Sequence, residues 1–290
     1  MFGWFKRART GNRAEERPVE HQRADWPLHG YRIVDGTMRD ANGRPVDVGF
    51  IEGASREEAV AIASFEGALG RPFAPLLDCG TSDDGSLVLV WPHALPLFET
   101  ARRHRPSLGV AVELAQTMLL GSELLTRALE SQRLDLERDA LLRHVHVDAA
   151  GVVLRAPLAR PHQPARMGTL RGVRLLAPEQ VRGRPWQPAT DVFAVGAALV
   201  ELVLGKPLFP VDESKLRVDL ERLMRAELPA PLATLGVPAP LAELLEGSFL
   251  KAAPEQRCAD AAAARAALAP FAGSDDEVKA WLLDAVPRGA

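Results

Sequence analysis

The sequence predicts an α+β fold in which a small β-rich part precedes a larger helical part. From about Trp26 to Trp91, apolar and polar residues alternate as in strands, with one helical interruption. Residues 107–132 follow a helical period instead. Val192–Leu204 is apolar almost all round, broken only by Glu201. A helix without a polar face has to be buried, so these 290 residues are expected to enclose a sizeable core.

The β-rich part is expected to begin with a hairpin. Residues 31–34 and 46–50 are its predicted strands, because Asn42-Gly43 between them is a strong turn signal. A capping box, a serine followed three residues later by a glutamate, predicts a helix over residues 55–69. Residues 86–90 are predicted to form a further strand.

In the helical part, the helix at 107–132 is expected to pack against the apolar helix, whose predicted N-cap is Thr190-Asp191. Residues 145–155 are predicted to form a hairpin between these helices. Residues 215–270 are expected to be helical, and Ser274 to cap one further short helix.

These elements divide the chain into four predicted regions. The N-terminal region is expected to be disordered, because it combines mixed charge with few apolar residues. The regions are an N-terminal segment at 1–25, a smaller N-lobe at 26–92, a helical C-lobe at 93–271, and a C-terminal helix and tail at 272–290.

Charge and cysteine content narrow the range of functions. The net charge of −3 gives no indication of a nucleic-acid partner. Cys79 and Cys258 are expected in different lobes, so neither a disulfide nor a cysteine metal site is predicted. No uninterrupted run of about 18 apolar residues and no signal-peptide core occur. The expected location is the cytoplasm, with a peripheral position at the inner face of the membrane as the alternative.

Three matched elements resemble the C-lobe of the bacterial Ser/Thr protein kinases. Ala177-Pro178-Glu179 matches the Ala-Pro-Glu motif of this family, and Asp191 with Gly196 matches the Asp-x-x-x-x-Gly that opens its buried helix. Residues 244–261 match the segment before the last kinase helix, with Arg257 at the conserved arginine. The resemblance implies a two-lobed kinase-like fold, a buried ion pair between Glu179 and Arg257, and a structural role for Asp191.

The N-lobe departs from the family at the phosphate-binding positions. No Gly-x-Gly-x-x-Gly loop occurs between Tyr31 and Phe50, and Gly49 stands at the position of the lysine. No lysine lies between Arg7 and Gly205, so a shifted alignment does not restore one. Where the family binds adenine, the chain has Trp91-Pro92-His93, and its proline has no N–H to donate.

The catalytic positions of the C-lobe are altered as well. Residues 137–144 match the catalytic loop and keep Asp139 at the base position, but His144 replaces the metal-binding asparagine. Ala156 stands near the aspartate of Asp-Phe-Gly. Since two oxygen ligands are missing, the sequence predicts no magnesium site, no other metal site and no cofactor.

The chain is therefore predicted to be a pseudokinase, a catalytically inactive scaffold or regulator that binds a protein partner. One alternative is a small-ligand or nucleotide sensor that works without metal. Another is an atypical transferase on a kinase-like fold.

Three places are candidate contact sites. The first nine residues combine aromatic with basic side chains and could contact an anionic membrane weakly or dock on protein. In the arginine-rich segment between Leu158 and Ala177, Thr169 is the only hydroxyl residue; it could be phosphorylated, or the segment could meet an acidic partner. Trp281 on the last predicted helix is the third. The contact residues of the first site are Phe2, Trp4, Phe5, Lys6, Arg7 and Arg9.

Overall fold

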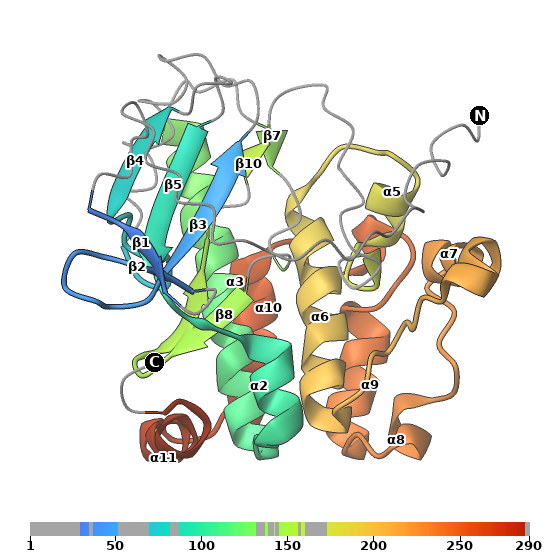
Figure 1. Cartoon of the computed structure of the whole chain (residues 1–290). Helices are drawn as coiled ribbons and strands as arrows, with labels where there is room; N and C mark the ends of the chain where they lie inside the picture. Colours follow the sequence, from blue (N-terminus) through green and yellow to red (C-terminus); the bar gives the residue numbers. More distant parts are fainter. Residues whose placement is uncertain are drawn as a thin grey trace.

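A computed structural model of the whole chain shows a mixed α+β protein with small antiparallel sheets and a larger helical part (Figure 1). The structure describes residues 30–34, 37–51, 70–81, 87–131, 137–138, 142, 145–155, 158–159 and 173–287. The predicted helix at residues 55–69 lies outside this part of the chain.

The main sheet has the order β3-β5-β4, with β3 at Val46–Ile51, β5 at Leu87–Pro92 and β4 at Asp78–Thr81. The central strand β5 is antiparallel to both neighbours. Val88 and Val90 on β5 are fully buried, which explains why this apolar strand takes the central position. The strand predicted at residues 86–90 is thereby confirmed and extended.

The predicted first hairpin is wrong in its pairing. β1 (Arg32–Val34) pairs with β2 (Thr37–Arg39), while β3 pairs with β5. The turn at Asn42-Gly43 exists, since Gly43 has a φ of +77°, but beyond it only one bridge joins Arg39 to Pro45. The turn signal is local, whereas the apolar β5 offers β3 a full ladder of partners.

A pair of long helices forms the centre of the helical part. α3 (Leu108–Ser131) packs against α6 (Pro188–Leu204), as predicted, and α10 (Ala261–Leu268) packs against both (Figure 1). The side chains on α6 from Ala189 to Leu202 are all buried, as its apolar sequence requires.

The predicted hairpin at residues 145–155 is confirmed. β8 (Val145–Asp148) pairs with β9 (Gly151–Leu154), and β6 (Leu95–Pro96) joins β8 as a third strand. Leu154 also bridges to Phe73. The end of β9 therefore lies next to Phe73, which comes from the β-rich part. Two further short strands, β7 (Glu137–Arg138) and β10 (Leu158–Ala159), pair with each other.

The N-cap predicted for α6 lies one turn too late. The helix begins at Pro188, whose missing N–H costs nothing at a first helical position, and Gln187 is the cap. Thr190 therefore lies in the first turn, where its Oγ1 accepts a hydrogen bond from the Gln187 N–H at 3.1 Å.

The remaining helices surround this core. Ser274 caps α11 as predicted, because its Oγ accepts from the Glu277 N–H while the Glu277 carboxylate accepts from the Ser274 N–H. The other elements are α2 (Leu97–Arg103), α5 (Pro178–Val181), α7 (Leu216–Met224), α8 (Leu232–Leu235), α9 (Ala239–Ser248), α11 (Asp275–Ala285) and the 3₁₀ turns Glu213–Lys215, Pro254–Gln256 and Ala269–Phe271.

The helix α3 has the length and composition of a membrane span over Leu108–Ala128, where the mean hydropathy is 1.3. More than half of this stretch is buried inside the protein, against α6, α10 and β9. Core helices of this kind have the same composition, so the stretch does not indicate a membrane location.

Candidate functional site

Gly49, which the family resemblance is expected to place at the kinase lysine, lies under an aromatic ring. Trp91 is directly opposite Asp47 in the β3–β5 pair, so its side chain shares a face with Gly49. A Cβ atom at Gly49 would lie 2.6 Å from Cζ3 and 2.8 Å from Cη2 of Trp91. The indole is 6% exposed. The ring therefore fills the space that any side chain at residue 49 would need.

A cluster of charged residues joins the sheet to the hairpin next to this ring. Asp47 on β3 accepts a hydrogen bond from His93 Nδ1 at 2.8 Å and one from the Ala94 N–H at 3.2 Å. The guanidinium of Arg155, directly after β9, pairs with the same carboxylate and lies 5.0 Å from the centre of the Trp91 ring. We call Asp47, His93, Arg155 and Trp91 the junction cluster.

The junction cluster keeps Asp47 ionised. Burial by itself raises the pKa of this carboxyl group, but the hydrogen bond from His93, the charge of Arg155 and the Ala94 N–H together outweigh it. The pKa of Asp47 therefore lies below its ordinary value. Asp47 lies two residues before Gly49 on β3, and Arg155 lies one residue before Ala156.

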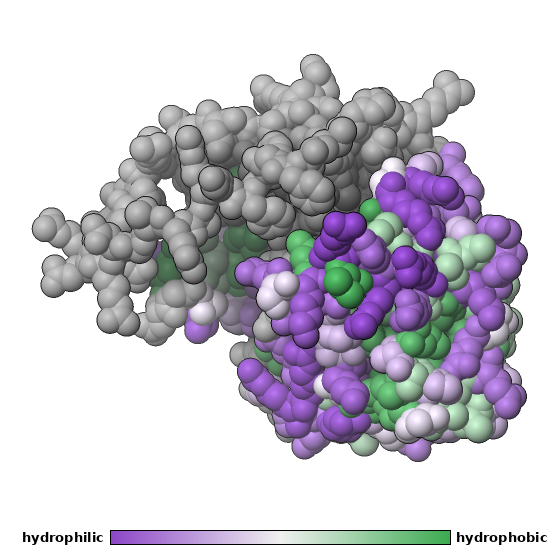
Figure 2. Space-filling view, turned by 90° about the vertical axis from the view of Figure 1, so that its right-hand side faces the viewer, coloured by the Kyte–Doolittle hydropathy of each residue, from purple (hydrophilic) through white to green (hydrophobic). Residues whose placement is uncertain are grey.

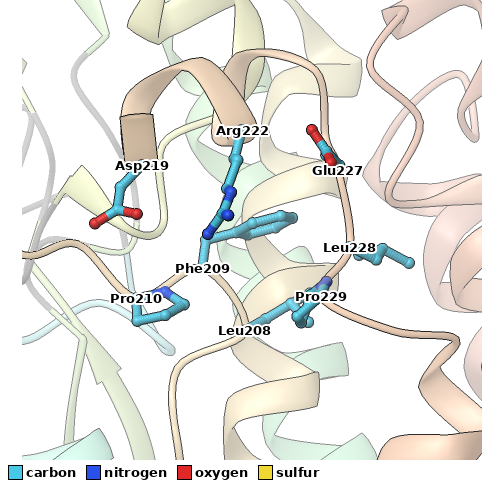
Figure 3. A pocket seen from close by; sticks show the side chains of 8 residues that line it. All are labelled: Leu208, Phe209, Pro210, Asp219, Arg222, Glu227, Leu228 and Pro229. Carbon is cyan, nitrogen blue, oxygen red and sulfur yellow. The ribbon is translucent and has the colours of Figure 1, made fainter. Parts of the chain in front are cut away.

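A groove lies between the loop that follows α6, the helix α7 and the loop that follows α7 (Figure 3). Its volume of about 240 Å³ suits one or two side chains, since sites for drug-sized molecules begin near 300 Å³. On the face of the molecule turned to the viewer in Figure 2, apolar surface is exposed between hydrophilic residues. The groove is lined by Leu208, Phe209, Pro210, Asp219, Arg222, Glu227, Leu228 and Pro229.

The groove combines an apolar floor with two available charges. Leu208 and Phe209 are 3% and 5% exposed, and the ring of Phe209 stacks on Phe193 of α6 at 5.7 Å. Arg222 and Glu227 are exposed at the rim, and neither side chain forms an ion pair with another residue that the structure describes. An apolar group flanked by opposite charges is therefore complementary to this surface.

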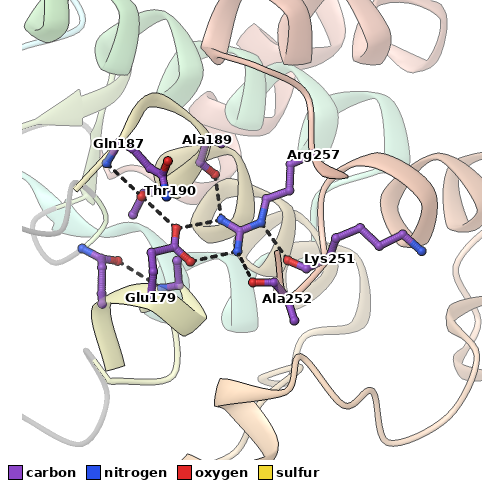
Figure 4. A network of polar contacts seen from close by, with 9 residues as sticks. Glu179, Gln187, Ala189, Thr190, Lys251, Ala252 and Arg257 are labelled. Carbon is purple, nitrogen blue, oxygen red and sulfur yellow. Dashed lines mark hydrogen bonds and ion pairs between the residues drawn. The ribbon is translucent and has the colours of Figure 1, made fainter. Parts of the chain in front are cut away.

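The predicted ion pair between Glu179 and Arg257 is confirmed (Figure 4). Two parallel bonds of 2.8 Å join the guanidinium to the carboxylate, and both side chains are almost fully buried. Arg257 also donates to the carbonyl groups of Ala189, Lys251 and Ala252, and Glu179 accepts from Thr190 Oγ1. The network ties α5, the start of α6 and the turn before α10 together.

The arginine sets the protonation of this buried acid. Burial raises the pKa of Glu179, but the hydrogen bonds and charge of Arg257 lower it more, and the pKa ends below its ordinary value of 4.5. Asp191 is buried as well and accepts a hydrogen bond of 2.7 Å from Ser122 on α3. All three residues therefore lie in the interior, where they hold helices together.

The sequence analysis missed a second buried charge network. Glu201 on α6 accepts two bonds from Arg174, at 2.8 and 3.0 Å, and one of 2.8 Å from Arg102 on α2. The available signal was Glu201 itself, the only charged residue in the apolar stretch Val192–Leu204, because a buried acid of this kind requires a buried cation. The sequence does not reveal which arginine supplies it.

Trp281 does not lie where a partner could reach it. It is 8% exposed, packs in the main core and donates its indole N–H to the carbonyl of His104 at 2.8 Å. Its predicted role as a contact residue is therefore wrong, because the apolar face of α11 needs this ring to cover α2 and α3. Asp139, His144, Ala156, Thr169 and residues 1–9 lie outside the described residues.

Within the described part of the chain, no group of three or more His, Cys, Asp or Glu side chains is placed to hold a metal ion. No protein-family model matches the chain, and no curated protein is significantly similar to it.

Proposed function

We propose that this protein is a pseudokinase: a kinase-like, two-lobed protein without phosphoryl-transfer activity that acts as a protein-interaction scaffold or regulator. The antiparallel β3-β5-β4 sheet followed by a helical part is compatible with that fold. The buried pair of Glu179 and Arg257 supports it further, because the pair joins the two motifs that carry the family resemblance.

One observation carries the proposed loss of catalysis. Trp91 covers Gly49, and Arg155 is already paired with Asp47. A phosphate group would need a cation at this place, yet Arg155, the arginine of the junction cluster, is already paired with Asp47. We therefore propose that the protein acts by binding a partner on its outer surface and not by catalysis.

ATP with magnesium is expected to leave the melting temperature unchanged. A ligand at a hundred times its dissociation constant stabilises a fold by about 2.7 kcal/mol, which a thermal-shift assay detects easily. The assay compares millimolar ATP with and without magnesium, and magnesium alone is the control. A rise that requires both ATP and magnesium contradicts the proposal, whereas a rise with ATP alone favours the metal-free nucleotide sensor.

The proposed partner binds the groove with an apolar side chain flanked by an acidic and a basic residue. The apolar floor of Leu208 and Phe209 accommodates the apolar group. Arg222 then pairs with the acid and Glu227 with the base, since both are without ion-pair partners among the described residues. Such rim charges contribute to specificity and to the rate of association more than to affinity.

Selection from a random peptide library is expected to enrich this pattern. Reversing both rim charges, as Arg222→Glu with Glu227→Lys, is expected to reverse the preferred order of acid and base around the apolar residue. Stability should change by less than about 0.5 kcal/mol, because both residues are exposed.

The matched control is Glu243→Lys, an exposed charge reversal on α9 outside the groove lining. It is expected to leave the selected pattern unchanged. If no peptide is enriched, or if the enriched peptides bind the reversed variant equally well, the groove is not the partner site.

We also retain weak contact of residues 1–9 with an anionic membrane as a proposal, to be tested by sedimentation with liposomes.

A further inference from the structure

The carboxylate of Asp47 occupies a site that has the properties of an anion-binding site. Three hydrogen-bond donors converge on it: His93 Nδ1, the Ala94 N–H and the Arg155 guanidinium. His93 and Ala94 come from the connection after β5, and Arg155 comes from the end of β9. Their target comes from a third segment, β3.

The donors are held in place by contacts that do not involve Asp47. The Ala94 N–H belongs to the backbone between β5 and β6, and the backbone N–H of His93 is bonded to the carbonyl of Pro45 at 3.3 Å. Arg155 lies over the face of Trp91, which is itself packed on Gly49. Removing the Asp47 carboxylate would therefore leave three oriented donors around a vacated space.

The site suits a planar carboxylate. One oxygen of Asp47 accepts from His93, and the other accepts from both Ala94 and Arg155. The side chains of His93, Asp47 and Arg155 are 29%, 23% and 13% exposed, so a small solute can reach the site while much of its charge is shielded from water. In such surroundings, hydrogen bonds to an ionised group are stronger than at an open surface.

We propose that His93, Ala94 and Arg155 form a carboxylate-binding site that Asp47 fills from within the chain, and that an external carboxylate binds there when Asp47 is displaced. Displacement separates β3 from Arg155, so an acidic ligand at this site removes the ion pair that joins β3 to the end of the β8–β9 hairpin. The inference goes beyond the proposed function and does not depend on it, because it follows from the contacts of the junction cluster alone.

Chemical rescue tests the site directly. Asp47→Ala is expected to lower the melting temperature, and formate or acetate at up to about 200 mM is expected to restore about 2–4 °C relative to chloride at equal ionic strength. Wild-type protein should show no such carboxylate-specific rise, because its site is occupied. If Asp47→Ala folds poorly, the midpoint of urea refolding with and without formate provides the same comparison.

Two variants serve as controls. Asp47→Asn keeps the space filled with an amide and should not respond to formate. Asp47→Ala combined with Arg155→Ala lacks the main cation and should not respond either. A rise specific to carboxylates, seen in Asp47→Ala alone, supports the site. The proposal is overturned if the melting temperature of either control rises equally, if chloride has the same effect as formate, or if Asp47→Ala shows no rise at all.

Discussion

Replacing Arg257 with alanine is expected to lower the free energy of unfolding by roughly 3–5 kcal/mol, because it strands a buried carboxylate. Among the described side chains, only Thr190 would then still donate a hydrogen bond to Glu179, and the carbonyl groups of Lys251, Ala252 and Ala189 would lose a donor. Urea denaturation at neutral pH measures the loss. It is a large fraction of the 5–15 kcal/mol that stabilises a typical domain.

The double replacement of Glu179 and Arg257 by alanine should cost no more than Arg257→Ala alone, since removing the acid relieves the stranded charge. Glu179→Ala should lower the free energy of unfolding somewhat less than Arg257→Ala, because Arg257 keeps three carbonyl acceptors and its contact with the ring of Phe193. As a control, Arg217→Ala breaks an exposed pair with Glu221 and should cost less than about 1 kcal/mol. Additive losses at Glu179 and Arg257 would show that the two residues do not share one site.

The same pair makes the stability depend on pH in the acid range. Because the folded pKa of Glu179 lies below its ordinary value of 4.5, the unfolded chain binds this proton more readily. The stabilisation is therefore present in full above about pH 4.5 and is lost as the pH falls through the lower folded pKa. The difference between wild type and Arg257→Ala should accordingly be smaller at pH 3 than at pH 7. An unchanged difference would contradict this linkage.

Replacing Glu201 with leucine is expected to have a comparable effect, again roughly 3–5 kcal/mol, since it leaves Arg174 charged and buried. The side chain of Arg174 is 9% exposed, and its two bonds to Glu201 are the main compensation for its burial. Arg174 also lies 5.6 Å from the ring of Phe98, a contact that does not replace a carboxylate.

Arg102→Ala is the matched control for this network. Its side chain is 35% exposed, and Glu201 keeps both bonds to Arg174, so the expected loss is below about 1 kcal/mol. Replacing Glu201 and Arg174 together with leucine should recover part of the stability lost in Glu201→Leu, because no charge remains buried. Urea denaturation of the wild type, of Glu201→Leu, of Arg102→Ala and of the double variant measures these losses. Equal losses of unfolding free energy in Glu201→Leu and Arg102→Ala would mean that Arg174 can stay buried without its carboxylate partner at little cost.

Local sequence patterns predicted much of the fold. The apolar helix α6, the helix α3 against it, the hairpin of β8 and β9 and the cap of α11 all follow from periodicity, turn residues or capping residues a few positions apart. The pair of Glu179 and Arg257 was reached differently, through the resemblance of two motifs 78 residues apart.

The candidate site was only partly predictable. The absence of a lysine between Arg7 and Gly205 is a property of the sequence alone. The family resemblance predicts that Gly49 stands at the lysine position, but the sequence could not show that Trp91 lies over this glycine. No sequence pattern indicated the groove next to α7, because its lining comes from one helix and the two loops on either side of it.

The sequence by itself determined that the segments of α3 and α6 are helical, that those of β5, β8 and β9 are extended, and that no lysine lies between Arg7 and Gly205. Only the tertiary structure decided which partners these segments and charges have. β3 pairs with β5 instead of β1, Arg174 reaches Glu201, and three segments meet at Asp47. Residues far apart in the chain are brought together by the packing of whole strands and helices, and a pattern that extends over a few residues carries no information about which distant surface offers the best fit.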